Sequence, residues 1–285
     1  MSGVLYIVAT PIGNLDDISL RAIATLKSVA LIAAEDTRHS KFLLNHLGVD
    51  TRMISCHEHN EESRCADILQ LLTDGSDVAL ISDAGTPLIS DPGYRLVRAV
   101  REAGLQVSPI PGANSAIAAL SAAGLATESF HFYGFLSSRA GQRATQLEAL
   151  GGLDGTLVLF ESSHRILGLL QQLLQTFPER QCVIAKELTK LHEQFLCGKP
   201  TELIALFDND KNLTRGEFVV LIDNSSVAGS KQLEHEDRQM LAILLDEVSV
   251  KLAVKIAVRL SGKKKNELYQ LALEMSANDD IAAED

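Results

Sequence analysis

Residues 78–93 read VALISDAGTPLISDPG, an apolar run that stops abruptly at a loop rich in glycine and proline. The run from Val78 to Ile81 has the length and composition of a strand buried on both faces. Asp91 before Pro92 predicts the N-cap of a helix that ends at Gly104. The stretch therefore predicts strand, loop and helix in succession. In parallel sheets such loops lie at the carboxyl ends of the strands, where ligands bind.

The charge of this loop indicates what kind of ligand it suits. Asp83 and Asp91 are its only ionisable side chains. A loop that binds phosphate presents backbone N–H groups and lysine, whereas two carboxylates suit a positively charged ligand such as an ammonium or a sulfonium. Asp91 has the alternative role of capping the next helix. Asp83 has no predicted capping role and is the better candidate for a ligand contact.

Length and composition limit the class of protein. A chain of 285 residues has room for two domains and a small third. The net charge of −11 excludes a protein that is basic overall, so any contact with nucleic acid needs a local basic patch. Four cysteines without a C-x-x-C pair favour reduced thiols over a disulfide framework or zinc site. No signal peptide or membrane-spanning run is evident, so we expect a cytoplasmic protein without a membrane partner.

The order of strand and helix patterns predicts the fold class. Strands alternate with helices about five times in residues 1–124, which predicts an α/β domain with a parallel, doubly wound sheet. Residues 125–225 contain further strands and an amphipathic helix, and we interpret them as a second α/β domain with a mixed sheet. The spacing of apolar residues predicts that residues 231–278 form a helical extension.

The extension carries a local excess of positive charge. Two short helical segments around Ser261-Gly262 resemble a helix-turn-helix. Cations recur at four-residue spacing and then in a run, and we predict that they bind nucleic acid: Lys251, Lys255, Arg259, Lys263, Lys264 and Lys265. The alternative is an ordinary solvated helix face.

Other polar clusters are ambiguous. His57-Glu58-His59 could hold a metal but lacks a third ligand, so a polar loop is the simpler interpretation and we expect no metal site. His164 follows a predicted strand and belongs either to a site or to a surface loop. Lys186 and Glu187 end a strand, where they either face a cleft or form an ion pair. No nucleotide-binding, zinc-hydrolase or serine-hydrolase motif is present.

Six motifs occur in order along residues 4–223: LYIVATPIGNL, AAEDTR, SDAGTPLISDPG, PGANSA, FESSHR and KELTKxxE. Together they resemble the tetrapyrrole-methylase-like superfamily of S-adenosylmethionine methyltransferases. Within it, they resemble the group that methylates a ribose of small-subunit ribosomal RNA, as does the basic extension. The resemblance implies two α/β domains with the cofactor cleft between them and a helix-turn-helix-like extension.

The resemblance also implies a function. It implies that a cytoplasmic homodimer binds S-adenosylmethionine and methylates the ribose 2′-hydroxyl of a decoding-centre cytidine in 16S rRNA, in the small ribosomal subunit. The superfamily's central loop commonly reads G-D-P, where this chain has Ser82-Asp83-Ala84. Matched residue by residue, the cofactor-binding positions are Pro11, Asp83, Gly85, Thr86, Pro87, Ser115, Ala116, Phe135, Leu136, Glu161 and Ser162.

The sequence leaves several alternatives open. A base would help a weakly nucleophilic hydroxyl, and the candidates at predicted strand ends are Asp36, Lys186, Glu187 and His164. Arginine binds phosphate bidentately, so Arg38, Arg139 and Arg165 are candidates for gripping RNA. Two other functions fit less well: methylation of a tetrapyrrole or corrinoid precursor, and RNA binding without catalysis.

Overall fold

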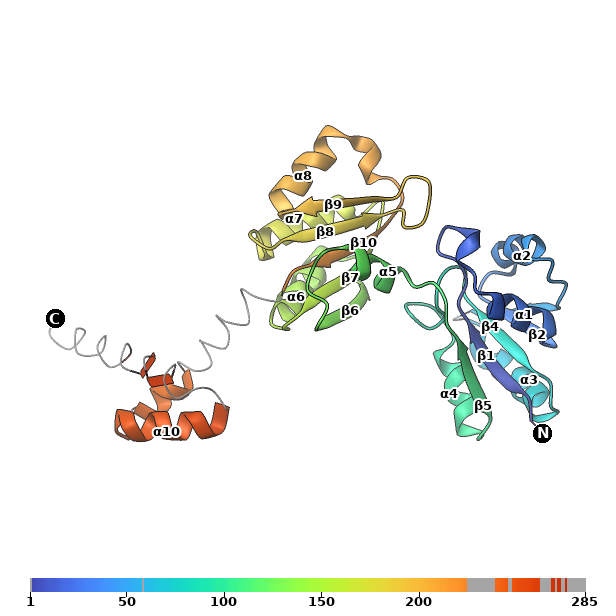
Figure 1. The fold of residues 1–285 in the computed structure, drawn as a ribbon, viewed down its shortest axis with the longest axis horizontal. Coiled ribbons are helices and arrows are strands. Elements are labelled where there is room, and N and C mark those ends of the chain that lie inside the picture. The colour runs from blue at the N-terminus through green and yellow to red at the C-terminus, as the bar shows by residue number, and fades with distance from the viewer. Residues whose placement is uncertain are drawn as a thin grey trace.

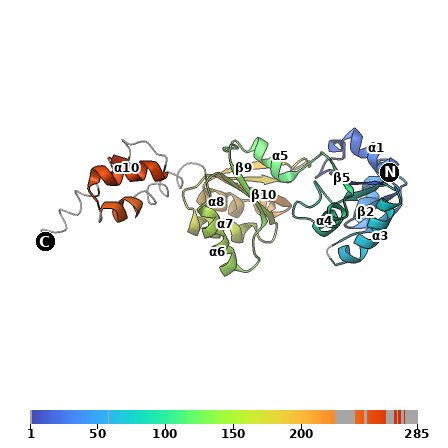
Figure 2. The ribbon, with the colours of Figure 1, turned by 90° about the horizontal axis from the view of Figure 1, so that it is seen from below.

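A computed structural model describes residues 2–57, 59–224, 239–245, 248–261, 268–269, 271–272 and 275. It contains two five-stranded sheets. Figures 1 and 2 show these sheets side by side, joined by the segment that leads from β5 to α5. Short 3₁₀ helices occur at Leu15–Asp17 and Lys211–Thr214. Three of the predicted nucleic-acid contacts, Lys263, Lys264 and Lys265, lie outside the described residues.

The first sheet is parallel throughout, with strand order β3-β2-β4-β1-β5. Its strands are β1 (Val4–Val8), β2 (Leu31–Ala34), β3 (Met53–Ser55), β4 (Val78–Ile81) and β5 (Gln106–Ile110). One face packs on α1 (Leu20–Ser28) and α2 (Thr37–His46), and the other on α3 (Glu61–Thr73) and α4 (Tyr94–Glu102). Every residue of β2 and β4 is buried. The prediction of a doubly wound parallel sheet is confirmed.

The second sheet is mixed, as predicted. Its order is β6-β7-β10-β8-β9, with β6 and β7 parallel and the remaining pairs antiparallel. The strands are β6 (Phe130–Phe135), β7 (Thr156–Ser162), β8 (Cys182–Lys186), β9 (Gln194–Gly198) and β10 (Glu217–Ile222). One face packs on α6 (Ala140–Gly151), α7 (Ile166–Thr176) and α8 (Pro200–Asn209), and the opposite face packs on α5 (Ser115–Ala122).

The packing of α5 bears on the domain boundary. We predicted that the first domain extends to residue 124, which would include α5. In the structure the small side chains Ala116 and Ala119 pack with Val158 and Val219 of the second sheet. We therefore propose that the boundary lies before Asn114, the residue that caps α5.

The start of α4 corrects one prediction. The helix begins at Tyr94 after Gly93, whose φ of 124° favours glycine, and Asp91 is not its N-cap. A first-turn N–H group is satisfied from another helix: the Leu96 N–H donates to Oε1 of the buried Glu61 at 2.8 Å. The sequence could not reveal this bond because the two residues lie far apart along the chain.

We predict that Glu61→Ala lowers the free energy of unfolding by about 1–3 kcal/mol, because a buried N–H loses its acceptor. Asp91→Asn is the matched comparison and should leave stability unchanged or raise it at neutral pH. Burial raises the pKa of Asp91, so its charged form opposes folding. Urea unfolding of both variants at pH 7 is the measurement. A larger loss from Asp91→Asn would restore Asp91 as the residue that stabilises α4.

Candidate active site

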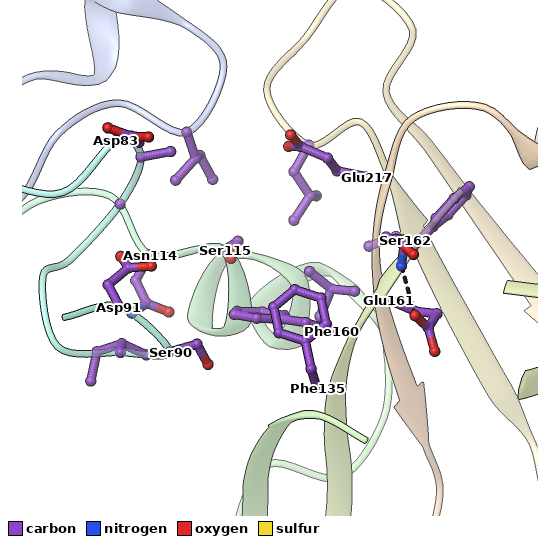
Figure 3. A pocket seen from close by; sticks show the side chains of 18 of the residues that line it. Asp83, Ser90, Asp91, Asn114, Ser115, Phe135, Phe160, Glu161, Ser162 and Glu217 are labelled. Atoms are coloured by element: carbon purple, nitrogen blue, oxygen red, sulfur yellow. Dashed lines mark hydrogen bonds between the residues drawn. The ribbon is translucent and has the colours of Figure 1, made fainter. Parts of the chain in front are cut away.

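A cavity of about 520 Å³ is lined by loops of the first domain, by the start of α5 and by residues of the second sheet. In Figure 3, Asp83 and Asp91 approach it from the loop after β4, and Phe135, Ser162 and Glu217 approach from the opposite side. This position is the carboxyl edge of the first sheet, where the pattern of residues 78–93 predicted a ligand site.

The loop after β4 is held in an unusual conformation. Its Gly85 forms a two-bond bridge with Thr10, with N···O distances of 2.9 and 3.1 Å, so it is joined to the loop after β1. Gly85 has a φ of 80°, but Leu88 and Ser90 also have positive φ, at 73° and 68°. Such conformations cost about 1–3 kcal/mol each in a non-glycine residue and persist where surrounding structure enforces them. They are typical of functional loops.

Three carboxylates gather where β2 and β4 end. Glu35, Asp83 and Asp91 all line the cavity. Burial raises the pKa of Glu35, and the neighbouring Asp91 and Asp83 carboxylates raise it further. Burial also raises the pKa of Asp91. The described lining includes no lysine or arginine. The cavity therefore favours a ligand with positive charge, because such a ligand relieves repulsion among the three acids.

Close contacts join the two domains. The Asn14 N–H, in the loop after β1, donates to Thr189 Oγ1 after β8 at 3.1 Å. A Cβ on Gly13 would lie 2.8 Å from the Leu188 carbonyl oxygen, so only glycine fits without a shift. A Cβ on Gly134 in β6 would lie 2.6 Å from Ser90 Oγ. The strained loop of the first domain thus directly contacts the second sheet.

The structure brings most predicted cofactor positions together. Those that line the cavity are Asp83, Gly85, Thr86, Ser115, Phe135, Glu161 and Ser162. Four others are buried beside a lining residue and are not part of the lining themselves: Pro11, Pro87, Ala116 and Leu136. A motif locates a loop, but the side-chain direction depends on backbone dihedrals that the motif does not specify. The binding role of each residue stays a prediction.

The four predicted base candidates lie elsewhere. The hydrogen bond from Arg38, at 2.9 Å, lowers the pKa of Asp36 to about 2, and Asp36 also caps α2. Glu187 accepts hydrogen bonds from the Glu217 N–H at 2.9 Å and from Lys190 at 3.0 Å. Lys186 is buried at the end of β8, and His164 is exposed. None of the four is among the described lining residues.

Sequence reasoning missed Glu35, Phe160 and Glu217. Glu35 and Asp36 both follow β2, and only the first faces the cavity. The available signal was that the motif AAEDTR contains two adjacent acids. Side chains point alternately to the two faces of a strand, but this rule does not give the directions of the Glu35 and Asp36 side chains, because both lie beyond the end of β2.

The predicted RNA contacts are dispersed. Arg38 pairs with Asp36, and Arg139 is exposed just before α6. Arg165 pairs with Glu161 at 3.0 Å, inside the second domain. On α10 (Val250–Ser261), Lys251, Lys255 and Arg259 are exposed opposite a buried row of small apolar residues.

Two further observations concern metals and membranes. The His57 and His59 rings lie 6.1 Å apart, and Glu58 lies outside the described residues. Within the described ranges, no three His, Cys, Asp or Glu side chains gather as metal ligands would. Across the same ranges, no helix has both the length and the apolar character needed to span a membrane.

Comparison with known proteins supports the resemblance noted in the sequence. Residues 4–204 match the family model of Tetrapyrrole (Corrin/Porphyrin) Methylases, and residues 231–276 match the RsmI C-terminal HTH domain. A Pseudomonas aeruginosa protein named ribosomal RNA small subunit methyltransferase I is 46% identical over 96% of this chain and 98% of its own length. The protein of that name from Escherichia coli O157:H7 is 45% identical over 95% of each chain.

Solved structures show the same fold at lower identity. A uroporphyrin-III C-methyltransferase from Thermus thermophilus, complexed with S-adenosylhomocysteine, aligns with a TM-score of 0.55. It is 18% identical, and the alignment covers 78% of this chain and 97% of that one. Because the family model matches residues 4–204, which are most of the chain, this chain belongs to the tetrapyrrole (corrin/porphyrin) methylase family.

Proposed function

We propose that this protein uses S-adenosylmethionine to methylate the ribose 2′-hydroxyl of a decoding-centre cytidine in 16S rRNA. The observation that carries the proposal is the cavity between the domains, which presents Glu35, Asp83 and Asp91 and no basic side chain among its described lining. S-adenosylmethionine carries a sulfonium and an ammonium, which suit these acids. The RNA substrate is supported by full-length relatives named for ribosomal RNA methylation.

The lining residues suggest how the chain promotes methyl transfer. The bound cofactor would supply an electrophilic methyl group. The cavity would hold the hydroxyl oxygen close to that group, and such positioning lowers the entropic cost of the reaction. The hydroxyl is a weak nucleophile, so an acceptor for its proton helps. Glu35 lines the cavity and has a raised pKa, which makes it a better proton acceptor than Asp36, whose pKa is about 2.

The proposal extends to the rest of the molecule. The exposed cations of α10 would bind the RNA, because they form a local positive stripe on an acidic chain. We also propose a homodimer acting in the cytoplasm on the small ribosomal subunit, on the basis of the family resemblance.

Binding of S-adenosylmethionine should release protons and weaken as the pH falls. Glu35 and Asp91 have pKa values raised above the usual 4.5 and 3.8, so just above those values part of each is protonated in the free protein. A cationic ligand favours the carboxylate forms and displaces those protons. Calorimetry in buffers of different ionisation enthalpy measures the release. The double variant Glu35→Gln, Asp91→Asn should abolish it, and unchanged release would contradict the assignment.

Asp83→Asn should lower methyl transfer by about 10-fold or more, because it removes the charge that faces the ligand. The amide oxygen can still accept the Asp36 N–H, which donates to Asp83 Oδ1 at 3.1 Å, so the loop should persist. The assay is transfer of radiolabelled methyl from S-adenosylmethionine to purified small ribosomal subunits. Asp50→Asn, at an exposed position, is the control.

The same assay separates two functions. Label at a ribose 2′-oxygen supports the proposal. An enzyme that binds S-adenosylmethionine, leaves RNA unlabelled and labels a corrinoid or porphyrin precursor would instead support the tetrapyrrole alternative, which the family's name favours.

Replacing Lys251, Lys255 and Arg259 with glutamine should weaken RNA binding and leave the affinity for S-adenosylmethionine unchanged. Loss of three phosphate contacts should reduce the slope of log affinity against log salt by about 2. Filter binding across a salt series measures this slope. A triple variant of exposed first-domain cations, Lys27, Lys41 and Arg101, is the charge-matched control. Equal effects of the two triple variants would indicate a general charge effect and remove α10 from the interface.

A further inference from the structure

Arg165 connects the ends of two neighbouring strands of the second sheet. It occupies the N-cap position of α7, directly after the turn that follows β7. Its Nε lies 3.0 Å from Glu161 Oε1 on β7, and its Nη2 donates to the Leu136 carbonyl at 2.6 Å, just after β6. The Arg165 side chain is only 26% exposed. This guanidinium faces the protein interior, which does not suit a group that grips RNA phosphate.

Glu161 depends on this arginine for charge compensation. Its side chain is completely buried, and Oε1 also accepts the Ser162 N–H at 2.8 Å (Figure 3). Its other oxygen, Oε2, is buried and has no hydrogen-bond partner among the described residues. A buried carboxylate is stable only when its charge is balanced, and in the described structure Arg165 is its ion-pair partner.

The groups held in this way adjoin the cavity wall. Phe135 precedes Leu136, Ser162 follows Glu161, and both line the cavity. The Phe135 ring also packs edge to face on Phe160, with centroids 5.6 Å apart. The Arg165 guanidinium therefore holds the backbone at Leu136 directly and the backbone at Ser162 through Glu161. These two positions adjoin Phe135 and Phe160, which line the cavity. A lysine could reach one of the two acceptors but could not span both, because it lacks the planar fork of donors.

We infer that Arg165 is a positioning residue that sets the second-domain wall of the cavity through Glu161 and the Leu136 carbonyl, and that it does not contact RNA. The inference deepens the proposed function and rests on it, since the wall would face S-adenosylmethionine. It assigns to Arg165 an effect on cofactor binding that is separate from substrate binding.

The test compares Arg165→Lys and Arg165→Ala with Arg139→Ala, an exposed arginine that the sequence suggested for the same RNA role. Arg165→Lys should raise the KM for S-adenosylmethionine by about tenfold or more and leave the KM for ribosomal subunits unchanged. Arg165→Ala should have a larger effect in the same direction. Arg139→Ala should leave the cofactor KM unchanged. A higher subunit KM with unchanged cofactor binding in Arg165→Lys would overturn the inference and make Arg165 an RNA contact.

A second readout needs no ligand. Hydrogen exchange followed by mass spectrometry should show faster exchange in Arg165→Lys at residues 135–137 and at Ser162, whose N–H is held by Glu161. Exchange elsewhere in the second sheet should match the unmodified protein, which excludes general unfolding. Unchanged exchange at these sites would overturn the positioning role. If the unmodified protein binds no S-adenosylmethionine, the proposed function fails, and the exchange data still decide the role of Arg165.

Discussion

The structure depends on the point where β4 ends and the chain enters its strained loop. All of β4 is buried, so the strand has a fixed position in the sheet. The loop that follows is held on one side by the bridge between Thr10 and Gly85, and on the other by close contact between Ser90 and Gly134. These constraints keep Leu88 and Ser90 at positive φ. They also hold Asp83 and Asp91 in one cavity with Glu35.

The charge of this cavity has a physical cost and a chemical consequence. Burial raises the pKa of Glu35 and of Asp91, and repulsion from the neighbouring carboxylates raises the pKa of each further. A cationic ligand removes that repulsion. The opposite wall supplies the apolar component through Phe135 and Phe160, which pack edge to face. A ligand with a positive end and an apolar body would therefore match both walls.

Several residues have roles that depend on long-range contacts. Asp91 has the sequence context of a helix cap, but the Leu96 N–H group in the first turn of α4 donates its hydrogen bond to Glu61 on α3. Asp36 looks like a cleft acid, but it pairs with Arg38, and the adjacent Glu35 faces the cavity. Arg165 looks like a phosphate ligand, but it pairs with a buried acid. In each case the competing partner comes from chain geometry that local patterns do not encode.

The sequence by itself determined the two α/β domains, the parallel and mixed sheets, the family and the loop that bears the acids. The domains, the sheets and the loop follow from hydrophobic periodicity and from local glycine and proline patterns, which act over a few residues. The family follows from the resemblance of the six motifs to a known superfamily. The tertiary structure alone decided that α5 packs on the second sheet, that Glu35 joins Asp83 and Asp91, and that Arg165 lies inside the protein. Those outcomes depend on which strands become neighbours and on where each side chain points when its strand ends. Both are set by packing between segments distant along the chain.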